Sequence, residues 1–411
     1  MRVILAHKFH YLAGGAEVFV FEVARVLREH GHEVAHFSTL DERNLPAEHA
    51  DYFVKAPEYR AGSVLKRAVD FTKIVYYREA RKKFAQLIQD FKPDIVHAFG
   101  IYVQISPSIL YACKEAGVPV VMSCNDHKHI CANHGMYHHG RDCDECKFHR
   151  FWGPLLRPVA NRCCHGSLAF SLANGIEVAI HGLLDAYRRN VHTFLFASEY
   201  MARRTEEFWA KDTFRWRMLR NPLDISSQKY SEESDDFCLY FGRLMTAKGC
   251  QVLVEAMHHV HPGIRLVIVG DGPQEEELHE QVARLGLSNV EFTGPKWGEE
   301  LDPYLARARF VIVQSVWNEN FPYVVLQAFA SGKPVIGASR GGIPELVCDG
   351  KYGLVYDAHD PEALARCIER LWDAPEEAKA MGKAGREFVE REFNDERFYQ
   401  SLTDIYREVL A

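Results

Sequence analysis

The sequence predicts an α/β protein with two doubly wound domains, each a parallel sheet covered by helices on both faces. The chain has 411 residues, enough for two domains of roughly 200 residues each. Short, uninterrupted apolar runs alternate with helical stretches, which is typical of parallel strands that are buried on both faces. The alternation stops and restarts once, which indicates two separate sheets.

The N-terminal half contains the first series of predicted strands. A helix over Glu17–Glu29 separates the first two of them, as expected for a crossover between parallel strands. The predicted strands of this half are Val3–Ala6, Val34–Phe37, Ile95–Ala98, Val118–Ser123 and Phe194–Ala197.

The C-terminal half repeats the scheme after a break at Asn221-Pro222, where we expect the hinge. Residues 1–221 therefore form the predicted N-terminal domain, and residues 222–393 form the C-terminal one. Residues 394–411 have the amphipathic spacing of a final helix. The predicted strands of this half are Phe237–Leu244, Arg265–Gly270, Val290–Gly294, Phe310–Ser315 and Pro334–Ala338.

The composition is that of an ordinary globular protein, with 47% hydrophobic and 26% charged residues. No window reaches about 18 uninterrupted apolar residues, so no membrane-spanning helix is expected. The first ten residues contain too short an apolar run for a secretory signal and are predicted to be a strand. Eleven cysteines in such a chain indicate reduced thiols or metal ligands in the cytoplasm.

The net charge of −7 is unevenly distributed along the chain, because residues 1–220 carry 30 Lys and Arg against 24 Asp and Glu. Basic residues mix with aromatic ones in Arg60–Lys83, Lys147–Arg162 and Arg203–Arg220. Such segments favour contact with an anionic membrane surface, peripheral at its inner face. Charged helix faces with core aromatics are the alternative. Nothing in the sequence predicts a nucleic-acid partner.

Several polar or glycine-rich turns follow predicted strands, where ligands of open α/β sheets bind. Gly14 and Gly15 follow the first strand and allow the backbone to approach a ligand, although a tight turn explains them equally well. Arg243 and Lys248 follow the first strand of the second half, and two cations at a strand end can neutralise a diphosphate. A solvated loop is the alternative. Two further turns of this kind are Gly270–Pro273 and Gly341–Glu345.

The segment WNENFPYVVLQAF, residues 317–329, predicts a helix whose N-terminus can bind an anion. Pro322 suits the first helical position, and the next N–H groups, of Tyr323 and Val324, would then point out of the helix end. Glu319 and Gln327 lie eight positions apart, roughly two helical turns, so both are expected to line one side of a ligand. A core helix with a proline start is the alternative.

These motifs together resemble the retaining glycosyltransferases of family 4. The segments FGRLMTAKG, VGDGP, WNENFPYVVLQA, SGKPVIG and GGIPELV stand in the family's order, and GGAE stands near the start of the chain. The resemblance covers essentially the whole chain. It implies the GT-B fold, in which two Rossmann-like domains face each other across a cleft. It also implies that the C-terminal helix packs back on the first domain.

The resemblance also implies roles for individual residues. Arg243 and Lys248 match the pair that grips the donor diphosphate and stabilises the leaving nucleotide, so no divalent cation or other cofactor is required for catalysis. Glu319 matches the glutamate that holds hydroxyls of the donor sugar. Gly15, next to Gly14, matches the loop that closes on the donor phosphate. The expected donor-binding segment also contains Asn320, Phe321, Pro322, Tyr323 and Val324.

Two positions depart from the family pattern. Gln327 stands where a second glutamate normally binds the ribose diol, and losing that charge-assisted contact costs on the order of 1–2 kcal/mol. Asn125-Asp126-His127 stands where many relatives have His-Asp. Asn125 cannot shuttle a proton, but it can bind the donor sugar. Transfer in this family is viewed as front-face attack, so a protein base is not essential, and these three residues remain catalytic candidates.

A Cys- and His-rich insertion over residues 125–166 resembles a cysteine-bearing insertion of some family members. Cys143 and Cys146 have the spacing of half a structural zinc site, which Cys131 with Cys163 or Cys164 could complete. Buried free thiols are the competing interpretation, and a disulfide is disfavoured.

We therefore expect a metal-independent retaining glycosyltransferase. It would move a sugar from a nucleotide-sugar donor, with UDP favoured, to a glycan or lipid-linked saccharide during synthesis of a cell-surface polysaccharide. Gln327 and Asn125 motivate one alternative, a catalytically weak scaffold subunit that only binds nucleotide sugars. A nucleotide-sugar epimerase with the GT-B fold is the other alternative.

Overall fold

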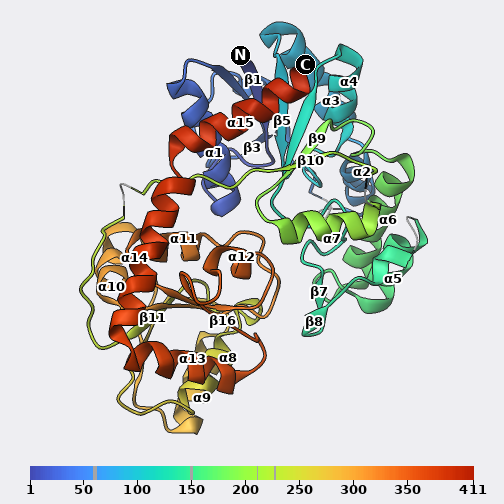
Figure 1. Cartoon of the computed structure of the whole chain (residues 1–411). Helices are drawn as coiled ribbons and strands as arrows, with labels where there is room; N and C mark the ends of the chain where they lie inside the picture. The colour runs from blue at the N-terminus through green and yellow to red at the C-terminus, as the bar shows by residue number, and fades with distance from the viewer. Residues whose placement is uncertain (59–62, 149–150, 211, 226–227) are drawn as a thin grey trace. The chain divides into compact units, whose positions relative to one another are not determined.

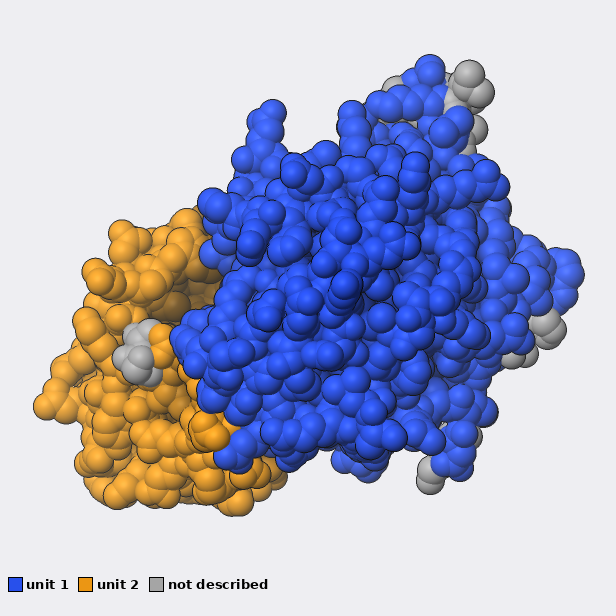
Figure 2. Space-filling view, turned by 90° about the horizontal axis from the view of Figure 1, so that it is seen from above, with its two compact units in different colours: residues 1–221, 398–411 blue, residues 222–397 orange. Residues whose placement is uncertain are grey.

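Two parallel sheets organise the protein. The computed structural model describes residues 1–58, 63–148, 151–210, 212–225 and 228–411. The chain divides into unit 1, residues Met1–Asn221 with Phe398–Ala411, and unit 2, residues Pro222–Arg397 (Figure 2). Each unit contains one six-stranded parallel sheet with helices packed against it (Figure 1). The predicted fold class, α/β with two Rossmann-like domains, is therefore confirmed.

The sheet of unit 1 has the strand order β10-β9-β6-β5-β1-β2, and all neighbours are parallel. Its switch point, where the strand order reverses, lies between β1 and β5. The bounds are β1 (Arg2–Ala6), β2 (Glu33–Phe37), β5 (Ile95–Phe99), β6 (Val120–Cys124), β9 (Thr193–Phe196) and β10 (Trp216–Met218). Two short pairs lie outside this sheet, β3 (Thr39–Leu40) with β4 (Val54–Lys55) and β7 (Tyr137–His138) with β8 (Arg141–Asp142).

Both faces of this sheet are apolar because successive side chains of a strand point to opposite sides. In β1, Ile4 and Ala6 belong to one buried cluster, whereas Val3 and Leu5 belong to another. Helices α3, α4 and α7 cover the first face, and α1 and α15 cover the second. The helices of unit 1 are α1 (Gly15–Glu29), α2 (Val64–Val75), α3 (Arg78–Phe91), α4 (Ser108–Ala116), α5 (Trp152–Asn161), α6 (Leu168–Leu184), α7 (Glu199–Trp209) and most of α15 (Asp395–Leu410).

A buried histidine fastens the C-terminal helix to the sheet of unit 1. The two ring nitrogens of His97 on β5 lie 2.8 Å from Tyr406 Oη and 2.8 Å from Ser123 Oγ. Phe398 and Leu402 of α15 pack beside them in the same apolar cluster as α1. The last residues of the chain therefore contribute both a hydrogen bond and apolar packing to the core of unit 1.

The burial of His97 predicts that acid destabilises unit 1. Burial lowers the pKa of His97 from 6.5 to about 3, so between these values the unfolded chain binds a proton that the folded chain excludes. The free energy of unfolding should then fall by up to about 1.4 kcal/mol per pH unit below pH 6.5. Hydrogen exchange of the β5 amides at about pH 7.5 and about pH 5.5, corrected for intrinsic rates, measures the change. A His97→Gln variant should show a flatter dependence, and equal slopes would contradict this account.

The sheet of unit 2 has the strand order β13-β12-β11-β14-β15-β16, again with parallel neighbours. Its strands are β11 (Cys238–Phe241), β12 (Leu266–Val269), β13 (Val290–Phe292), β14 (Val311–Val313), β15 (Val335–Ala338) and β16 (Gly353–Tyr356). The order has its switch point between β11 and β14.

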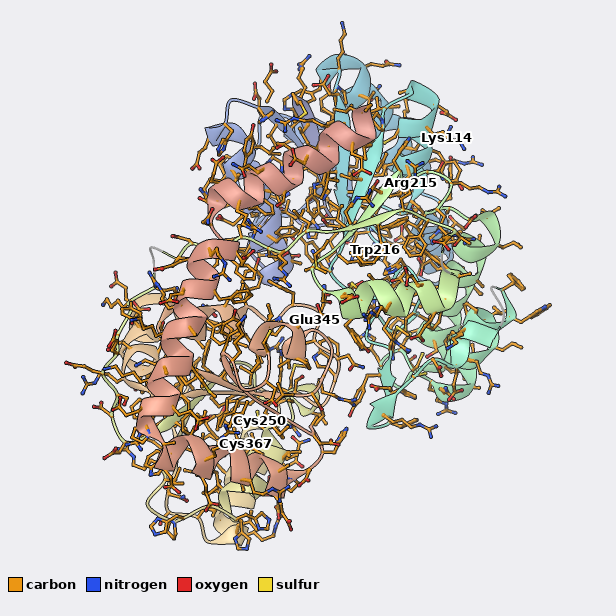
Figure 3. All side chains as sticks on the ribbon, viewed as in Figure 1. Lys114, Arg215, Trp216, Cys250, Glu345 and Cys367 are labelled. Atoms are coloured by element: carbon orange, nitrogen blue, oxygen red, sulfur yellow. The ribbon has the colours of Figure 1, made fainter. Side chains whose placement is uncertain are left out.

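Among the described residues of unit 2, seven α-helices connect or follow these strands: α8 (Cys250–Met257), α9 (Glu275–Leu285), α10 (Asp302–Arg307), α11 (Tyr323–Ala330), α12 (Ile343–Val347), α13 (Pro361–Asp373) and α14 (Pro375–Glu392). Cys250 and Cys367, labelled in Figure 3, lie on α8 and α13, which pack together. None of the helices that the structure describes, in either unit, is both long enough and apolar enough to cross a lipid bilayer.

Two edge strands are absent from the sequence prediction. β10 contains Trp216 (labelled in Figure 3) within a stretch that alternates basic and aromatic residues, so the sequence predicts surface there instead. β16 is four residues long and follows a glycine-rich turn at Gly350. Both strands have a partner on one side only. Short edge strands lack the long apolar runs that reveal central strands.

Candidate functional site

The loops that carry most of the candidate residues meet at the switch point of the unit 2 sheet. Arg243 and Lys248 follow β11, and Glu319 follows β14. These two strands are neighbours at the point where the strand order reverses. Because ligands of open α/β sheets bind beyond the carboxyl ends of strands at such a point, the three residues lie where a ligand is expected.

Lys248 and Glu319 form an ion pair, with 2.5 Å between Lys248 Nζ and Glu319 Oε1. The same carboxylate oxygen accepts a hydrogen bond from Trp317 Nε1 at 2.8 Å, and Ser315 Oγ lies 3.1 Å from it. Glu319 is buried, with 8% exposure. Its carboxylate is therefore fixed in position, and the ammonium of Lys248 offsets the cost of burying its charge.

Hydrogen bonds to one backbone oxygen join the two loops. Val316 N and Trp317 N both donate to Ala247 O, at 3.1 and 3.3 Å. Ser315 Oγ also lies 3.1 Å from this oxygen. These hydrogen bonds therefore fix the segment that precedes Glu319 relative to the turn that ends at Lys248. They keep the two side chains within ion-pair distance.

Glycines allow two further turns to approach these loops. Gly341 has φ +58°, and a Cβ there would lie 2.0 Å from Glu319 O. Gly342 N donates to that oxygen at 2.7 Å. Gly270 has φ +150°, and a Cβ there would lie 1.9 Å from Gly242 O. Only glycine fits at these contacts, so both glycine turns predicted from the sequence pack directly against the site. Glu345, labelled in Figure 3, follows the first of these turns on α12.

Helix α11 begins one residue later than the sequence predicts. Pro322 has an extended backbone, with φ −75° and ψ 110°, and is the N-cap, so Tyr323 is the first helical residue. Val325 N donates to Pro322 O at 3.1 Å. The N–H groups of Tyr323 and Val324 therefore lie at the start of the helix, where its dipole attracts an anion.

The predicted helical relation between Glu319 and Gln327 is wrong. Glu319 lies in the loop four positions before Tyr323, whereas Gln327 lies on α11, so two helical turns do not connect them. Gln327 is half-buried. Between them, Asn320 is half-buried and Phe321 packs its ring 5.9 Å from that of Phe393.

Arg243 lies on the loop after β11, and its side chain is exposed. Tyr240 Oη donates to Arg243 O at 3.1 Å, which fixes the backbone. Among the residues that the structure describes, the guanidinium makes no ion pair or hydrogen bond. The guanidinium is therefore available to bind an anion. The ammonium of Lys248, by contrast, is already paired with Glu319.

The β1–α1 turn of unit 1 holds a buried pair that the sequence does not reveal. Gly14 is the N-cap of α1 and Gly15 its first residue. His7 Nε2 and Glu17 Oε1 lie 2.9 Å apart, and both side chains are buried. Burial lowers the pKa of His7 despite the opposing effect of Glu17. Burial alone would raise the pKa of Glu17, but the hydrogen bond to His7 and the nearby charges of His7 and Lys8 together lower the pKa.

The Asn125-Asp126-His127 segment follows β6 in unit 1. Burial opposes the charge on Asp126, but the contact with His134 Nδ1 at 3.4 Å and the hydrogen bond from Lys128 N at 2.8 Å hold the pKa of Asp126 low. His127 is buried beside Tyr200, and burial lowers the pKa of His127 to about 4. His127 is therefore neutral near pH 7, and the carboxylate of Asp126 is held within its own loop.

Lys128 ties this loop to α6 and was not recognised from the sequence. Its ammonium lies 2.7 Å from Glu177 Oε2, and it donates to Asn174 Oδ1 at 2.9 Å and to Ala132 O at 3.3 Å. Burial disfavours the charge of Glu177, but Lys128 and then His181 lower the pKa of Glu177 to about 2. Lys128 and Glu177 are both about 1% exposed. A buried pair whose lysine has three acceptors anchors the loop rigidly.

The cysteines of the insertion lie near one another. Burial raises the pKa of Cys146, and the neighbouring thiols of Cys131, Cys143 and Cys164 raise it further. Cys163 Sγ lies 4.0 Å from Cys164 Sγ. The eleven cysteines, all of them among the described residues, are thiols rather than disulfides.

A metal site at these cysteines stays a prediction. Outside residues 149–150 of the insertion and the other undescribed positions, no group of three or more His, Cys, Asp or Glu side chains is arranged to hold an ion. The proposed zinc ligands Cys131, Cys143, Cys146 and Cys163 therefore gain no support from their geometry.

Two family models match the chain in succession. The model described as Glycosyltransferase Family 4 matches residues 13–227, and the model described as Glycosyl transferases group 1 matches residues 224–388. The first of these covers more than half of the chain. The two matches meet close to Asn221-Pro222, where the chain passes from unit 1 to unit 2.

Among curated proteins, the chain is similar to the lipopolysaccharide core biosynthesis glycosyltransferase LpsE of Rhizobium meliloti. The two are 33% identical over 171 residues, which is 41% of this chain and 48% of that protein. The chain spans about half the length of the curated relatives it matches.

Two solved structures resemble the whole chain. HepE of Anabaena in complex with UDP has a TM-score of 0.69 at 18% identity and covers 99% of this chain and 100% of its own. The lipopolysaccharide outer core galactosyltransferase WaaB has a TM-score of 0.70 at 15% identity, with the same coverage. At these identities the likeness establishes the fold.

Proposed function

The chain belongs to glycosyltransferase family 4, and from this premise we propose that it transfers a sugar from a nucleotide-sugar donor to a saccharide acceptor. The observation that carries the proposal is the Lys248–Glu319 ion pair at the unit 2 switch point, between Arg243 and the start of α11. An anion-binding helix start, two cations and a fixed carboxylate suit a ligand that carries both a diphosphate and a sugar.

We propose that the donor is a UDP-sugar. HepE, whose fold this chain shares, has been solved with UDP and with UDP-glucose. The acceptor is proposed to be a glycan or lipid-linked saccharide of a cell-surface polysaccharide, because the names of the Rhizobium relative and of WaaB both refer to lipopolysaccharide.

In the proposed reaction, Arg243, Lys248 and the N–H groups of Tyr323 and Val324 bind the diphosphate. Glu319 accepts hydrogen bonds from the sugar hydroxyls. The bond between the anomeric carbon and the phosphate oxygen breaks, and a bond from the acceptor oxygen forms on the same face, so configuration is retained. The acceptor proton passes to the leaving phosphate. Arg243 and Lys248 stabilise the charge that grows on that phosphate, which is the role a metal ion plays in other transferases.

The unit 1 candidates are compatible with a reaction that needs no protein base. Asp126 is held by Lys128 N and His134, and the buried His127 is neutral near pH 7. Asn125 can donate or accept a hydrogen bond but cannot move a proton. We propose that these residues position the sugar or acceptor rather than exchange a proton with it.

A panel of nucleotide sugars tests the proposed function. Each UDP-, GDP- and ADP-sugar is incubated with the chain in buffer containing a metal chelator, and released nucleotide and sugar products are measured. Turnover of one donor class with retained anomeric configuration supports the proposal. Nucleotide binding without turnover of any donor or acceptor would instead favour a binding scaffold.

Gln327→Glu is expected to tighten donor binding by about 1–2 kcal/mol, or roughly tenfold. A carboxylate there accepts from both ribose hydroxyls, whereas the amide accepts from one and donates to the other. Calorimetric titration with the donor found in the panel measures the change. Gln327→Ala is the matched control, expected to weaken binding. Weaker binding by Gln327→Glu than by wild type would place the ribose away from α11.

A further inference from the structure

Helix α6 presents an apolar face to the outside of unit 1 along its whole length. Leu168, Leu172, Ile176, Ile180 and Leu183 follow one another at steps of four, four, four and three, which places them on one side of the helix. Leu168, Leu172 and Leu183 are 53%, 44% and 63% exposed. The only titratable side chains of α6 are Glu177 and His181, and both are buried on the other side.

Two neighbouring helices extend this surface. Helices α5 and α2 both pack against α6 (Figure 1). Helix α5 exposes Trp152 and Leu156, and helix α2 exposes Val69. Half of the large apolar side chains that are exposed among the described residues belong to these three helices. We call this set the α6 face: Val69, Trp152, Leu156, Leu168, Leu172, Leu183 and Leu184. A gathering of this kind marks an interaction surface.

Basic residues border the α6 face. A groove of about 840 Å³ lies between Ile180 of α6 and the α2–α3 junction, and its charged lining residues are Lys73, Arg78 and Glu79. Lys73 Nζ lies 2.8 Å from Asp70 Oδ1. Residues 63–83 carry seven Lys and Arg against two Asp and Glu. Arg78 is exposed and makes no ion pair among the described residues. The apolar face is therefore bordered by a segment of net positive charge.

We propose that the α6 face docks on an anionic lipid surface, with α6 lying in the plane of the interface. Leucines, a tryptophan and a basic border are the combination that inserts at the boundary between headgroups and acyl chains. A second copy of the chain is a less suitable partner for the α6 face. Pairing two such faces would bring two positively charged segments together, and these would repel each other. The proposal rests on exposure and charge, and does not depend on the proposed transfer reaction.

The face is preformed because the other side of α6 is anchored. Glu177 and Asn174 hold Lys128, and His181 Nε2 lies 2.8 Å from Val75 O at the end of α2. Docking therefore requires no unfolding of the helix, and it would fix the loop that carries Asp126 relative to the lipid surface.

The proposed surface keeps part of two of the three basic-aromatic stretches that the sequence predicts, and it adds α6 in place of the third. In the Arg203–Arg220 stretch, Trp209, Phe214 and Trp216 pack against the core of the sheet, and Trp216 Nε1 donates to Glu206 Oε1 at 3.0 Å. In the Arg60–Lys83 stretch, Tyr77 is buried, and Arg60 lies outside the described residues. Of the three stretches, Lys147–Arg162 contributes most to the exposed apolar surface, through Trp152 and Leu156.

Vesicle flotation tests the proposal. The full chain is mixed with vesicles of phosphatidylcholine alone, or with added phosphatidylglycerol, at low and high salt. We expect binding that needs phosphatidylglycerol and weakens with salt. Leu172→Asp/Leu183→Asp should lower the partition coefficient roughly tenfold or more. Leu40→Asp, at a leucine of similar exposure on β3, should bind as wild type. Lys73→Gln/Arg78→Gln should lose mainly the phosphatidylglycerol dependence.

Three outcomes would overturn the proposal. The first is the absence of binding to phosphatidylglycerol vesicles, and the second is equal binding by wild type and the Leu172→Asp/Leu183→Asp variant. The third is a dimer of the wild type that sediments as a monomer once these leucines are changed, since the face would then join two copies. Both readouts are independent of sugar transfer, so they can fail while the proposed function stands.

Discussion

Glu319→Ala is expected to abolish sugar transfer, with kcat lowered by about a hundredfold or more. The change removes the carboxylate that receives Lys248 Nζ at 2.5 Å and Trp317 Nε1 at 2.8 Å, and that is proposed to hold the donor sugar. Both the proposed sugar contact and the position of Lys248 are lost together. Single-turnover kinetics with saturating donor measure the effect on the chemical step.

Glu276→Ala is the matched control for this experiment. Glu276 is an exposed glutamate on α9 of the same unit, so its removal should leave kcat unchanged. If Glu319→Ala retained a large part of the wild-type rate while folding normally, the carboxylate would not hold the donor sugar.

Lys248→Met is the second change with a large expected effect. Methionine keeps the apolar stem but removes the charge that is proposed to stabilise the leaving diphosphate. Removing one such group costs about 10²- to 10³-fold in kcat, because its interaction strengthens as the charge develops. KM should change less. Initial-rate kinetics over a range of donor concentrations separate the two parameters.

Lys379→Met controls for the loss of a lysine–glutamate pair as such. Lys379 Nζ lies 3.0 Å from Glu232 Oε2 at an exposed position of unit 2, and exposed pairs contribute little. We expect this variant to turn over like wild type. A Lys248→Met variant with raised KM and unchanged kcat would show that Lys248 binds the ground state and the transition state equally, and so does not stabilise the developing charge.

The fold could be predicted because its central strands are buried on both faces. The runs at Val3–Ala6 and Ile95–Ala98 are apolar throughout, and the structure places them in adjacent strands β1 and β5. Edge strands such as β10 have a neighbour on one side only and carry no such run. Such edge strands form because they pair with a neighbouring strand, and the local sequence carries no information about that pairing.

The site could be predicted only in part, for the same physical reason. Arg243, Lys248 and Glu319 could be singled out because each follows a strand, but the Lys248–Glu319 contact joins residues 71 positions apart. The buried Lys128–Glu177 pair is even harder to predict from the sequence. An isolated lysine in a histidine-rich loop is normally expected to be exposed to solvent rather than buried in a core. The outward face of α6 has the composition of a core helix, and only its packing shows which side remains uncovered.

A crystal structure of the chain soaked with its nucleotide-sugar donor would show whether the unit 2 switch point holds the donor. We expect the diphosphate within hydrogen-bond distance of Arg243, Lys248 and the N–H groups at the start of α11. We also expect the sugar hydroxyls to lie against Glu319. A nucleotide bound elsewhere, with the Lys248–Glu319 pair undisturbed and no contact to α11, would contradict the proposed donor site.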